Sequence, residues 1–157
     1  MIRFRSLLRP VTILLSVGVV ATLPAEVPTS GNWKTDANQA WQSAQQEQRL
    51  MLLFITTENC LYCRKMEKDT FADQKVAAGI RQNCIPVAVL AENNETLVQK
   101  FRVRSYPTTV IISPKSGVVD YIVGYLGPDQ FSRRLDAATQ RSHTAAVARG
   151  PVGPATR

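Results

Sequence analysis

Two of the three cysteines, Cys60 and Cys63, are separated only by Leu61 and Tyr62. In a helix, this spacing places both thiols on the same face, within bonding distance of each other. One cysteine of such a pair can attack a substrate disulfide as a thiolate, and the other can then resolve the mixed disulfide. We therefore expect Cys60 and Cys63 to be the catalytic residues of a thiol–disulfide exchange.

The residues around the pair indicate how it is positioned. The apolar run from Leu50 to Ile55 is typical of a strand that is buried on both faces, and polar residues 56–59 predict a turn after it. A helix should begin near Cys60, where free N–H groups would stabilise a thiolate. Arg64 and Lys65 add positive charge nearby. In such motifs the pKa of the first cysteine falls from ~8.5 to between about 3.5 and 7.5.

A second motif is the segment Ser105-Tyr106-Pro107-Thr108. A proline cannot donate a hydrogen bond to a sheet ladder, so Pro107 must begin a strand or lie at a bend. Taken alone, the segment favours an ordinary loop proline. Combined with the cysteine pair and the order of elements, it indicates a second part of the active site.

The whole chain alternates between helical and extended patterns. The elements expected, in order, are a helix capped by Thr35 or Asp36, a strand at 50–55, a helix from Cys60 with a break near Asp73, helical turns at 76–82, a strand at 85–90, a helix around 97–101, strands at 108–112 and 118–123, and a helix capped by Asp129. Strands joined through a helix should be parallel, and the last two antiparallel. The prediction is an α/β fold, a three-layer α/β/α sandwich around a mixed sheet of four to five strands.

Both ends of the chain are expected to lie outside this domain. Three arginines precede a short apolar stretch from Val11 to Leu23, which is typical of a secretory signal and short for a membrane helix of roughly 20 residues. We expect residues 1–25 to be a signal peptide or an uncleaved anchor, and the protein to be exported, into a bacterial periplasm. Residues 26–32 read as a linker, 33–141 as the domain and 142–157 as a disordered tail.

Composition excludes several functions. The formal charge is +7, and no Lys/Arg run or basic aromatic stripe follows the N-terminal arginines, which argues against nucleic-acid binding. Three cysteines are too few for a disulfide scaffold. Cys84 is expected to be a small buried hydrophobe, with a regulatory thiol as the alternative. A zinc site from the three cysteines and His143 has suitable ligand types, but these residues are not expected to meet.

These motifs resemble those of the thioredoxin superfamily. The matching pieces are LMLLFITTENCLYC at 50–63, KMEKDTF at 65–71 and SYPTTVII at 105–112. The sequence looks most like bacterial exported thioredoxin-like proteins related to the periplasmic domain of the thiol:disulfide interchange reductase. The resemblance implies that Pro107 is cis and lies against the cysteine pair, and that Tyr106 offers its backbone to an extended substrate.

The expected substrates follow from this resemblance. We expect Tyr106, Pro107 and the exposed Tyr62 to bind protein thiols or disulfides. No metal or other cofactor is expected beyond the redox-active Cys60–Cys63 disulfide. A membrane electron donor or reoxidant is the expected redox partner, and the chain is expected to be a monomer.

The sequence also departs from the thioredoxin pattern. Thioredoxin carries a buried acid six residues before its first cysteine, and Phe54 stands at that place here. Glu58 is the nearest acid and a candidate for proton transfer, or it is simply solvated. The Leu61-Tyr62 dipeptide does not decide between reductase and oxidase, although the resemblance favours a reductase. The alternative function is a binding or chaperone-like module with a structural disulfide.

Overall fold

The computed structural model describes residues 33–148, and a four-stranded sheet forms their centre. The strands are β1 (Leu50–Thr56), β2 (Cys84–Leu90), β3 (Thr108–Ser113) and β4 (Gly117–Val123), in the order β2-β1-β3-β4. β1 pairs parallel to β2 and antiparallel to β3, and β3 pairs antiparallel to β4. The predicted mixed sheet is therefore confirmed.

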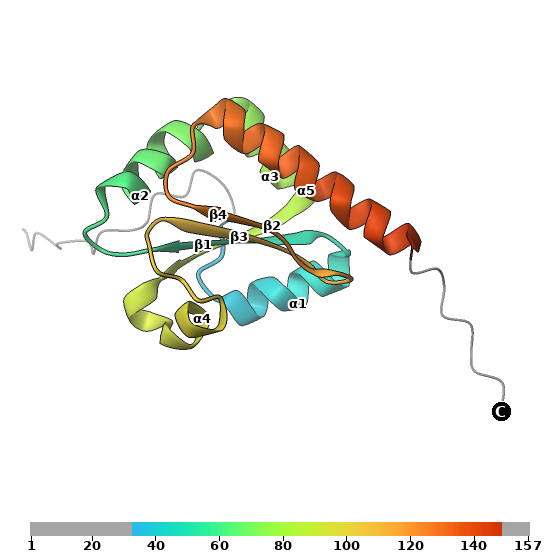
Figure 1. The fold of residues 1–157 in the computed structure, drawn as a ribbon, viewed down its shortest axis with the longest axis horizontal. Coiled ribbons are helices and arrows are strands. Elements are labelled where there is room, and N and C mark those ends of the chain that lie inside the picture. Colours follow the sequence, from blue (N-terminus) through green and yellow to red (C-terminus); the bar gives the residue numbers. More distant parts are fainter. Residues whose placement is uncertain (1–32, 149–157) are drawn as a thin grey trace, which may run out of the picture.

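The helices cover both faces of the sheet (Figure 1). One face packs against α1 (Ala37–Glu47) and α4 (Glu95–Lys100), and the other against α2 (Leu61–Lys65), α3 (Gln74–Asn83) and α5 (Pro128–Ala148). A π-helical segment, η1 (Met66–Phe71), continues α2, and a 3-10 turn, η2 (Ala91–Asn93), precedes α4. This is the three-layer sandwich that the sequence predicts.

β1 is one of the two central strands and is buried along its whole length. Because side chains alternate between the faces of a sheet, Leu52 and Phe54 enter the core beneath α2, α3 and α5, whereas Leu53 and Ile55 enter the core beneath α1. Burial on both faces explains why β1 is a continuous apolar run.

Aspartates begin two helices, at Asp36 as expected and at Asp73, where the sequence predicts a break. The Asp36 carboxylate accepts hydrogen bonds from the N–H groups of Asn38 and Gln39, and Asp73 caps α3 in the same way. The predicted cap at Asp129 is wrong, because α5 already begins at Pro128 and Asp129 lies in its first turn.

The C-terminal helix is longer than the sequence predicts. A disordered tail was expected from residue 142, but α5 continues to Ala148. Alanines favour the helix at its end, and the first glycine after it is Gly150. The signal or anchor at 1–25, the linker at 26–32 and the rest of the tail lie outside the described residues. Within 33–148, no helix is both long and apolar enough to cross a membrane.

Candidate functional site

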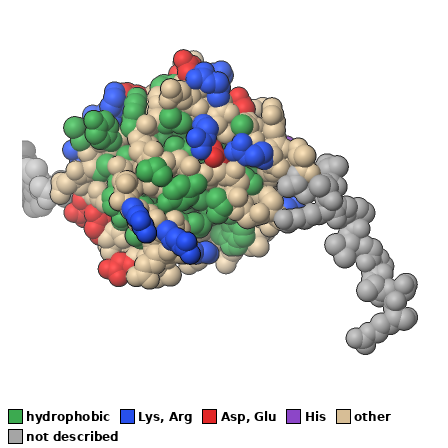
Figure 2. All heavy atoms as spheres, in the orientation of Figure 1, with side chains coloured by type: hydrophobic (Ala, Val, Ile, Leu, Met, Phe, Trp, Pro, Cys, Tyr) green, Lys and Arg blue, Asp and Glu red, His purple; other side chains and the backbone are tan. Residues whose placement is uncertain are grey.

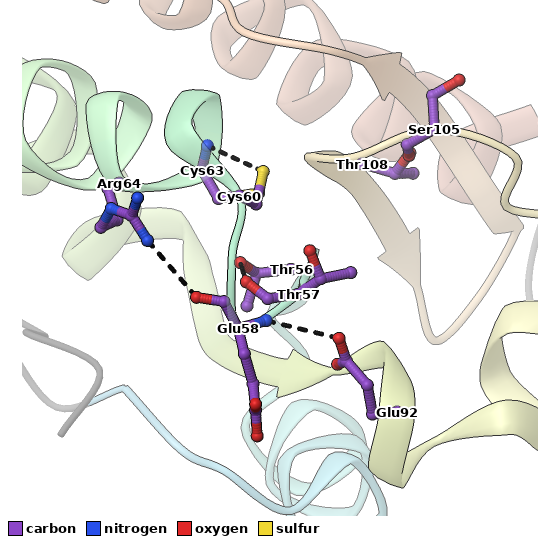
Figure 3. The surroundings of a disulfide bond; sticks show 9 residues. All are labelled: Thr56, Thr57, Glu58, Cys60, Cys63, Arg64, Glu92, Ser105 and Thr108. Atoms are coloured by element: carbon purple, nitrogen blue, oxygen red, sulfur yellow. Dashed lines mark hydrogen bonds between the residues drawn. A yellow bond between two sulfur atoms is a disulfide. The ribbon is translucent and has the colours of Figure 1, made fainter. Parts of the chain in front are cut away.

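The cysteine pair lies where β1 gives way to α2. Cys60 and Cys63 form a disulfide with their Cα atoms 5.2 Å apart. Cys60 is the N-cap residue of α2, and its sulfur accepts a hydrogen bond from the backbone N–H of Cys63 at 3.1 Å (Figure 3). The sulfur that must carry negative charge in an exchange reaction therefore already faces a hydrogen-bond donor.

The two cysteines differ in exposure. Cys60 is half-buried, whereas only 1% of Cys63 is exposed. Cys63 belongs to the same hydrophobic cluster as Phe54 and Met66. A substrate can therefore reach Cys60 from solvent, while Cys63 can be reached only from Cys60 or from the core.

The nearby cations have other partners. Arg64 donates a hydrogen bond to the backbone carbonyl of Glu58 at 3.3 Å. Lys65 pairs with Asp69, and its ammonium lies 5.0 Å from the centre of the Tyr125 ring. The hydrogen bond between Lys65 and Asp69 raises the pKa of the lysine and lowers the pKa of the carboxyl, so both are charged at neutral pH.

Glu58 is close to the disulfide in sequence, but its side chain is not directed toward it. Its backbone N–H donates to the Glu92 carboxylate at 3.4 Å, while its own carboxylate is exposed and points away from the cysteines (Figure 3). The predicted proton transfer by Glu58 has no contact in the structure to support it.

A different acid lies on the active-site helix. Glu67 stands four residues after Cys63 and is half-buried. Burial raises the pKa of its carboxyl, and the positive charge of Arg64 opposes this shift. Sequence reasoning missed Glu67, because its burial depends on the packing of η1 rather than on any local motif.

The proline loop leads into β3, whose first residue, Thr108, pairs with Ile55 near the end of β1. The peptide bond between Tyr106 and Pro107 is cis. The Thr108 hydroxyl donates to the Ser105 carbonyl at 2.7 Å, and the Gly124 N–H donates to the Pro107 carbonyl at 2.7 Å. Among the described residues, none hydrogen-bonds to the backbone of Tyr106, which leaves its N–H and carbonyl available to a bound chain.

Tyr125, which sequence reasoning also missed, completes the rim beside Tyr62. The two rings lie 6.5 Å apart, and the Tyr125 hydroxyl donates to Asp69 at 3.4 Å. The next residue is fixed as well, because the buried Thr70 hydroxyl donates to the Leu126 carbonyl at 2.6 Å. No sequence spacing connects these residues, which lie on η1 and on the loop after β4.

Hydrophobic side chains are numerous on the surface of the molecule, as the face in Figure 2 shows. The large exposed ones in the described residues are Leu61, Tyr62, Val118 and Val123. Leu61 and Tyr62 separate the cysteines, and Val123 pairs with Thr108 beside the proline loop. Two of these four side chains, Leu61 and Tyr62, are therefore adjacent to the disulfide in the chain, and Val123 lies on the edge strand β4.

The layer beneath the disulfide is apolar where thioredoxin carries an acid. Phe54 is 1% exposed, and its ring packs edge-to-face on Phe71 with the centres 5.0 Å apart. Trp33 packs against both rings. No carboxylate can occupy this place, as the sequence indicates.

Cys84 lies away from this site, at the start of β2. It is fully buried, and burial raises the pKa of its thiol to about 12, although the nearby Arg49 opposes the shift. Arg49 also donates to the carbonyls of Arg81 and Cys84. His143 is exposed on α5, and residues 33–148 contain no group of three His, Cys, Asp or Glu side chains that could hold a metal ion.

Comparison with known proteins agrees with this geometry. The family model of a thioredoxin-like domain matches residues 37–139. A thioredoxin from Thermus thermophilus is similar in structure, with a TM-score of 0.66 and 21% identity over 76% of this chain and 95% of that one. DsbH oxidoreductase gives a TM-score of 0.63 and 15% identity over 80% of this chain and 95% of its own.

A third similar structure is the oxidised C-terminal domain of DsbD from Neisseria meningitidis. Its TM-score is 0.57, at 14% identity over 66% of this chain and 97% of that one. A comparison with curated protein sequences gave no match. At these identities the solved structures establish the fold.

Proposed function

Because the chain belongs to the family of thioredoxin-like domains, we propose that it is a protein-disulfide oxidoreductase with Cys60 as the nucleophile and Cys63 as the resolving thiol. The observation that carries the proposal is the arrangement of the pair. Cys60 is accessible and its sulfur accepts the Cys63 N–H, while Cys63 is buried behind it. An inert structural disulfide would need neither feature.

The exchange proceeds in two steps. The Cys60 thiolate attacks one sulfur of a substrate disulfide, forming a mixed disulfide and releasing a substrate thiolate that takes up a proton. Cys63 then loses its proton and attacks Cys60, which releases the second substrate thiol and forms the Cys60–Cys63 disulfide. The substrate gains two electrons and two protons, and a dithiol reductant must return two electrons to the protein.

The proline loop and the exposed tyrosine provide the substrate contacts. The unpaired backbone of Tyr106 can hydrogen-bond to an extended polypeptide, and the exposed Tyr62 side chain between the cysteines can contact it. Because Cα atoms across a disulfide lie about 4.4–6.8 Å apart, the backbone of a substrate joined to Cys60 lies close to the surface around that cysteine. Protein thiols and disulfides are therefore the proposed substrates.

The direction and the location are further parts of the proposal. We propose reduction of protein disulfides in a bacterial periplasm, with a membrane dithiol donor as the source of electrons. The basic start and apolar stretch at 1–23 support export, and the sequence resemblance supports reduction.

Trapping tests the assigned roles. Reduced Cys63→Ser protein, mixed with a disulfide-bonded protein such as insulin, should accumulate a mixed disulfide through Cys60, because no thiol remains to resolve it. Cys60→Ser should give none, and Cys84→Ala should reduce insulin with dithiothreitol like the wild type. A mixed disulfide that forms through Cys63 or Cys84 instead would contradict the proposal.

One observation favours a second function. The apolar layer around Phe54 offers no acid to deprotonate Cys63, which suits a binding module with a permanent disulfide. Such a module would bind unfolded chains equally well in wild-type and Cys60→Ser form, and the wild type would not accelerate insulin reduction.

A further inference from the structure

A buried hydroxyl without a partner lies in the layer beneath the disulfide. Thr109 is 1% exposed, and its Oγ1 is fully buried with no hydrogen-bond partner among the described residues. Leaving such a group unpaired is unfavourable, because the hydroxyl loses its hydrogen bonds to water without replacing them. Two other buried polar atoms share this state, Arg49 Nε and Ser116 Oγ, but neither residue belongs to the sheet core.

The register of the sheet places Thr109 beside the missing acid. Thr109 on β3 lies directly opposite Phe54 on β1. Directly opposite residues of antiparallel strands point to the same face, with Cβ atoms about 4.5–5.5 Å apart. Ile111, two residues further along β3, belongs to the same hydrophobic cluster as Phe54 and Cys63. The Thr109 side chain therefore enters the layer that holds the buried cysteine.

The buried polar group of this layer therefore stands one strand away from the acid of thioredoxin. Where a thioredoxin has an acid on β1, this chain has Phe54, and the hydroxyl stands on the neighbouring strand, two residues after Pro107. In the oxidised protein the Cys63 sulfur is neutral and bonded to Cys60. In the reduced and mixed-disulfide states it becomes a thiol, a weak acceptor, or a thiolate, which is a strong acceptor in an apolar layer.

We propose that the Thr109 hydroxyl donates a hydrogen bond to the Cys63 sulfur once the disulfide opens, and so stabilises the thiolate that resolves the mixed disulfide. This inference rests on the proposed function. It explains why a hydroxyl that is costly in the oxidised state is present at this position, because opening the disulfide supplies its partner. The proton of Cys63 still leaves to solvent, and the hydroxyl only stabilises the anion that remains.

The first test is a comparison of the oxidised and reduced proteins. Thr109→Val replaces the hydroxyl by a methyl of similar size. In the oxidised protein it removes an unpaired group, so the melting temperature should stay equal or rise. In the reduced protein it removes a hydrogen bond, so the melting temperature should fall. A matched control is Thr139→Val on α5, whose hydroxyl bonds to the Leu135 carbonyl, and which should affect both states equally.

The second test is redox equilibrium. Equilibration with glutathione should shift about tenfold toward the oxidised protein in Thr109→Val, and Thr109→Ser, which keeps the hydroxyl, should stay near the wild type. Decay of a preformed mixed disulfide on Cys60 should slow by a similar factor, with its pH midpoint raised by about one unit. The attack of Cys60 on the substrate should keep its rate.

The results distinguish a failure of the role of Thr109 from a failure of the proposed disulfide exchange. Equal losses of melting temperature in both states, with an unchanged glutathione equilibrium, would overturn the role of Thr109. If Thr109→Val does not fold, Thr109→Ala replaces it in the same measurements. A wild-type pair that never exchanges with glutathione would overturn the proposed function instead, and the melting temperatures of the oxidised and chemically reduced proteins would still decide on Thr109.

Discussion

The backbone N–H of Cys63 donates a hydrogen bond to the sulfur of Cys60 at 3.1 Å. A donor at this distance favours the charged form of the sulfur after reduction. Three further features connect the same helix to the rest of the site, namely the contact between Tyr62 and Tyr125, the pair of Lys65 with Asp69 and the bond from Thr70 to the Leu126 carbonyl.

The first prediction concerns the acidity of Cys60. In reduced Cys63→Ser protein, where residue 63 still carries its N–H, the Cys60 thiol should titrate clearly below the ordinary ~8.5. The rate of alkylation by iodoacetamide, followed from pH 4 to 10, measures this pKa. A midpoint at 8.5 or above would show that the hydrogen bond does not stabilise the thiolate.

The second prediction is that Cys84 is inert. Because burial raises the pKa of its thiol to about 12, it should resist alkylation in the native protein at pH 8 while reduced Cys60 reacts. Mass spectrometry before and after denaturation counts the modified thiols. Cys84→Ser, which buries a hydroxyl in the core, should lower the free energy of unfolding more than Cys84→Ala. Rapid native alkylation of Cys84 would contradict this account.

The third prediction follows from the contact between β4 and α5. Burial alone would raise the pKa of Asp120, but hydrogen bonds and the charges of Arg134 and Arg141 hold it below its usual value. A lowered folded-state pKa means that the stabilisation is complete above the unfolded pKa of ~3.9 and is lost as the pH falls through the folded value. Asp120→Asn should cost about 1 kcal/mol at pH 7 and little at pH 2. Urea unfolding at both pH values measures the difference, and an equal cost at both would contradict the role of charge.

The fourth prediction concerns Glu67, whose negative charge lowers the stability of the fold at neutral pH, whereas that of Asp120 raises it. Burial raises the pKa of Glu67, with Arg64 opposing, so its carboxylate disfavours the folded state once the pH rises above the unfolded pKa of ~4.3. Glu67→Gln should therefore increase stability modestly at pH 7 and have little effect at pH 3. The exposed Asp136→Asn on α5 is the control. Destabilisation by Glu67→Gln at pH 7 would indicate a favourable contact of the carboxylate instead.

The fifth prediction concerns the rim of the site. Tyr125→Ala removes the ring beside Tyr62, so it should slow the reduction of insulin by roughly 2- to 12-fold, the range equivalent to one aromatic contact. Reduction of glutathione disulfide, which offers far less surface to the rim than a protein does, should change less. Tyr125→Phe keeps the ring and should behave like the wild type. Equal losses for both substrates would mean that Tyr125 only supports the fold.

Local patterns account for what the sequence predicted correctly. Each of these patterns spans only a few residues and has one dominant physical cause. They are the apolar run from Leu50 to Ile55, the cap at Asp36 and the spacing of Cys60 and Cys63. The mixed sheet follows from the order of these local elements.

Long-range packing accounts for the rest. The position of Thr109 beside Phe54 depends on the register between β1 and β3, which no local signal specifies. Glu58 is the acid nearest to the cysteines in sequence, but the turn directs its carboxylate away from them. The π-helical turns of η1 are not distinguishable from ordinary helix in the sequence, because Met66, Glu67 and Lys68 also favour an α-helix.

The reduction potential of the Cys60–Cys63 pair tests the central claim most directly. The purified protein would be equilibrated in glutathione and dithiothreitol buffers and its thiols trapped, with Cys60→Ser as the control. The account predicts a potential between about −270 and −120 mV, the span from thioredoxin to strong oxidants, with a value near the lower end for a reductase. A potential well below about −300 mV, or a pair that cannot be reduced and trapped, would contradict it and leave a structural disulfide in a binding domain.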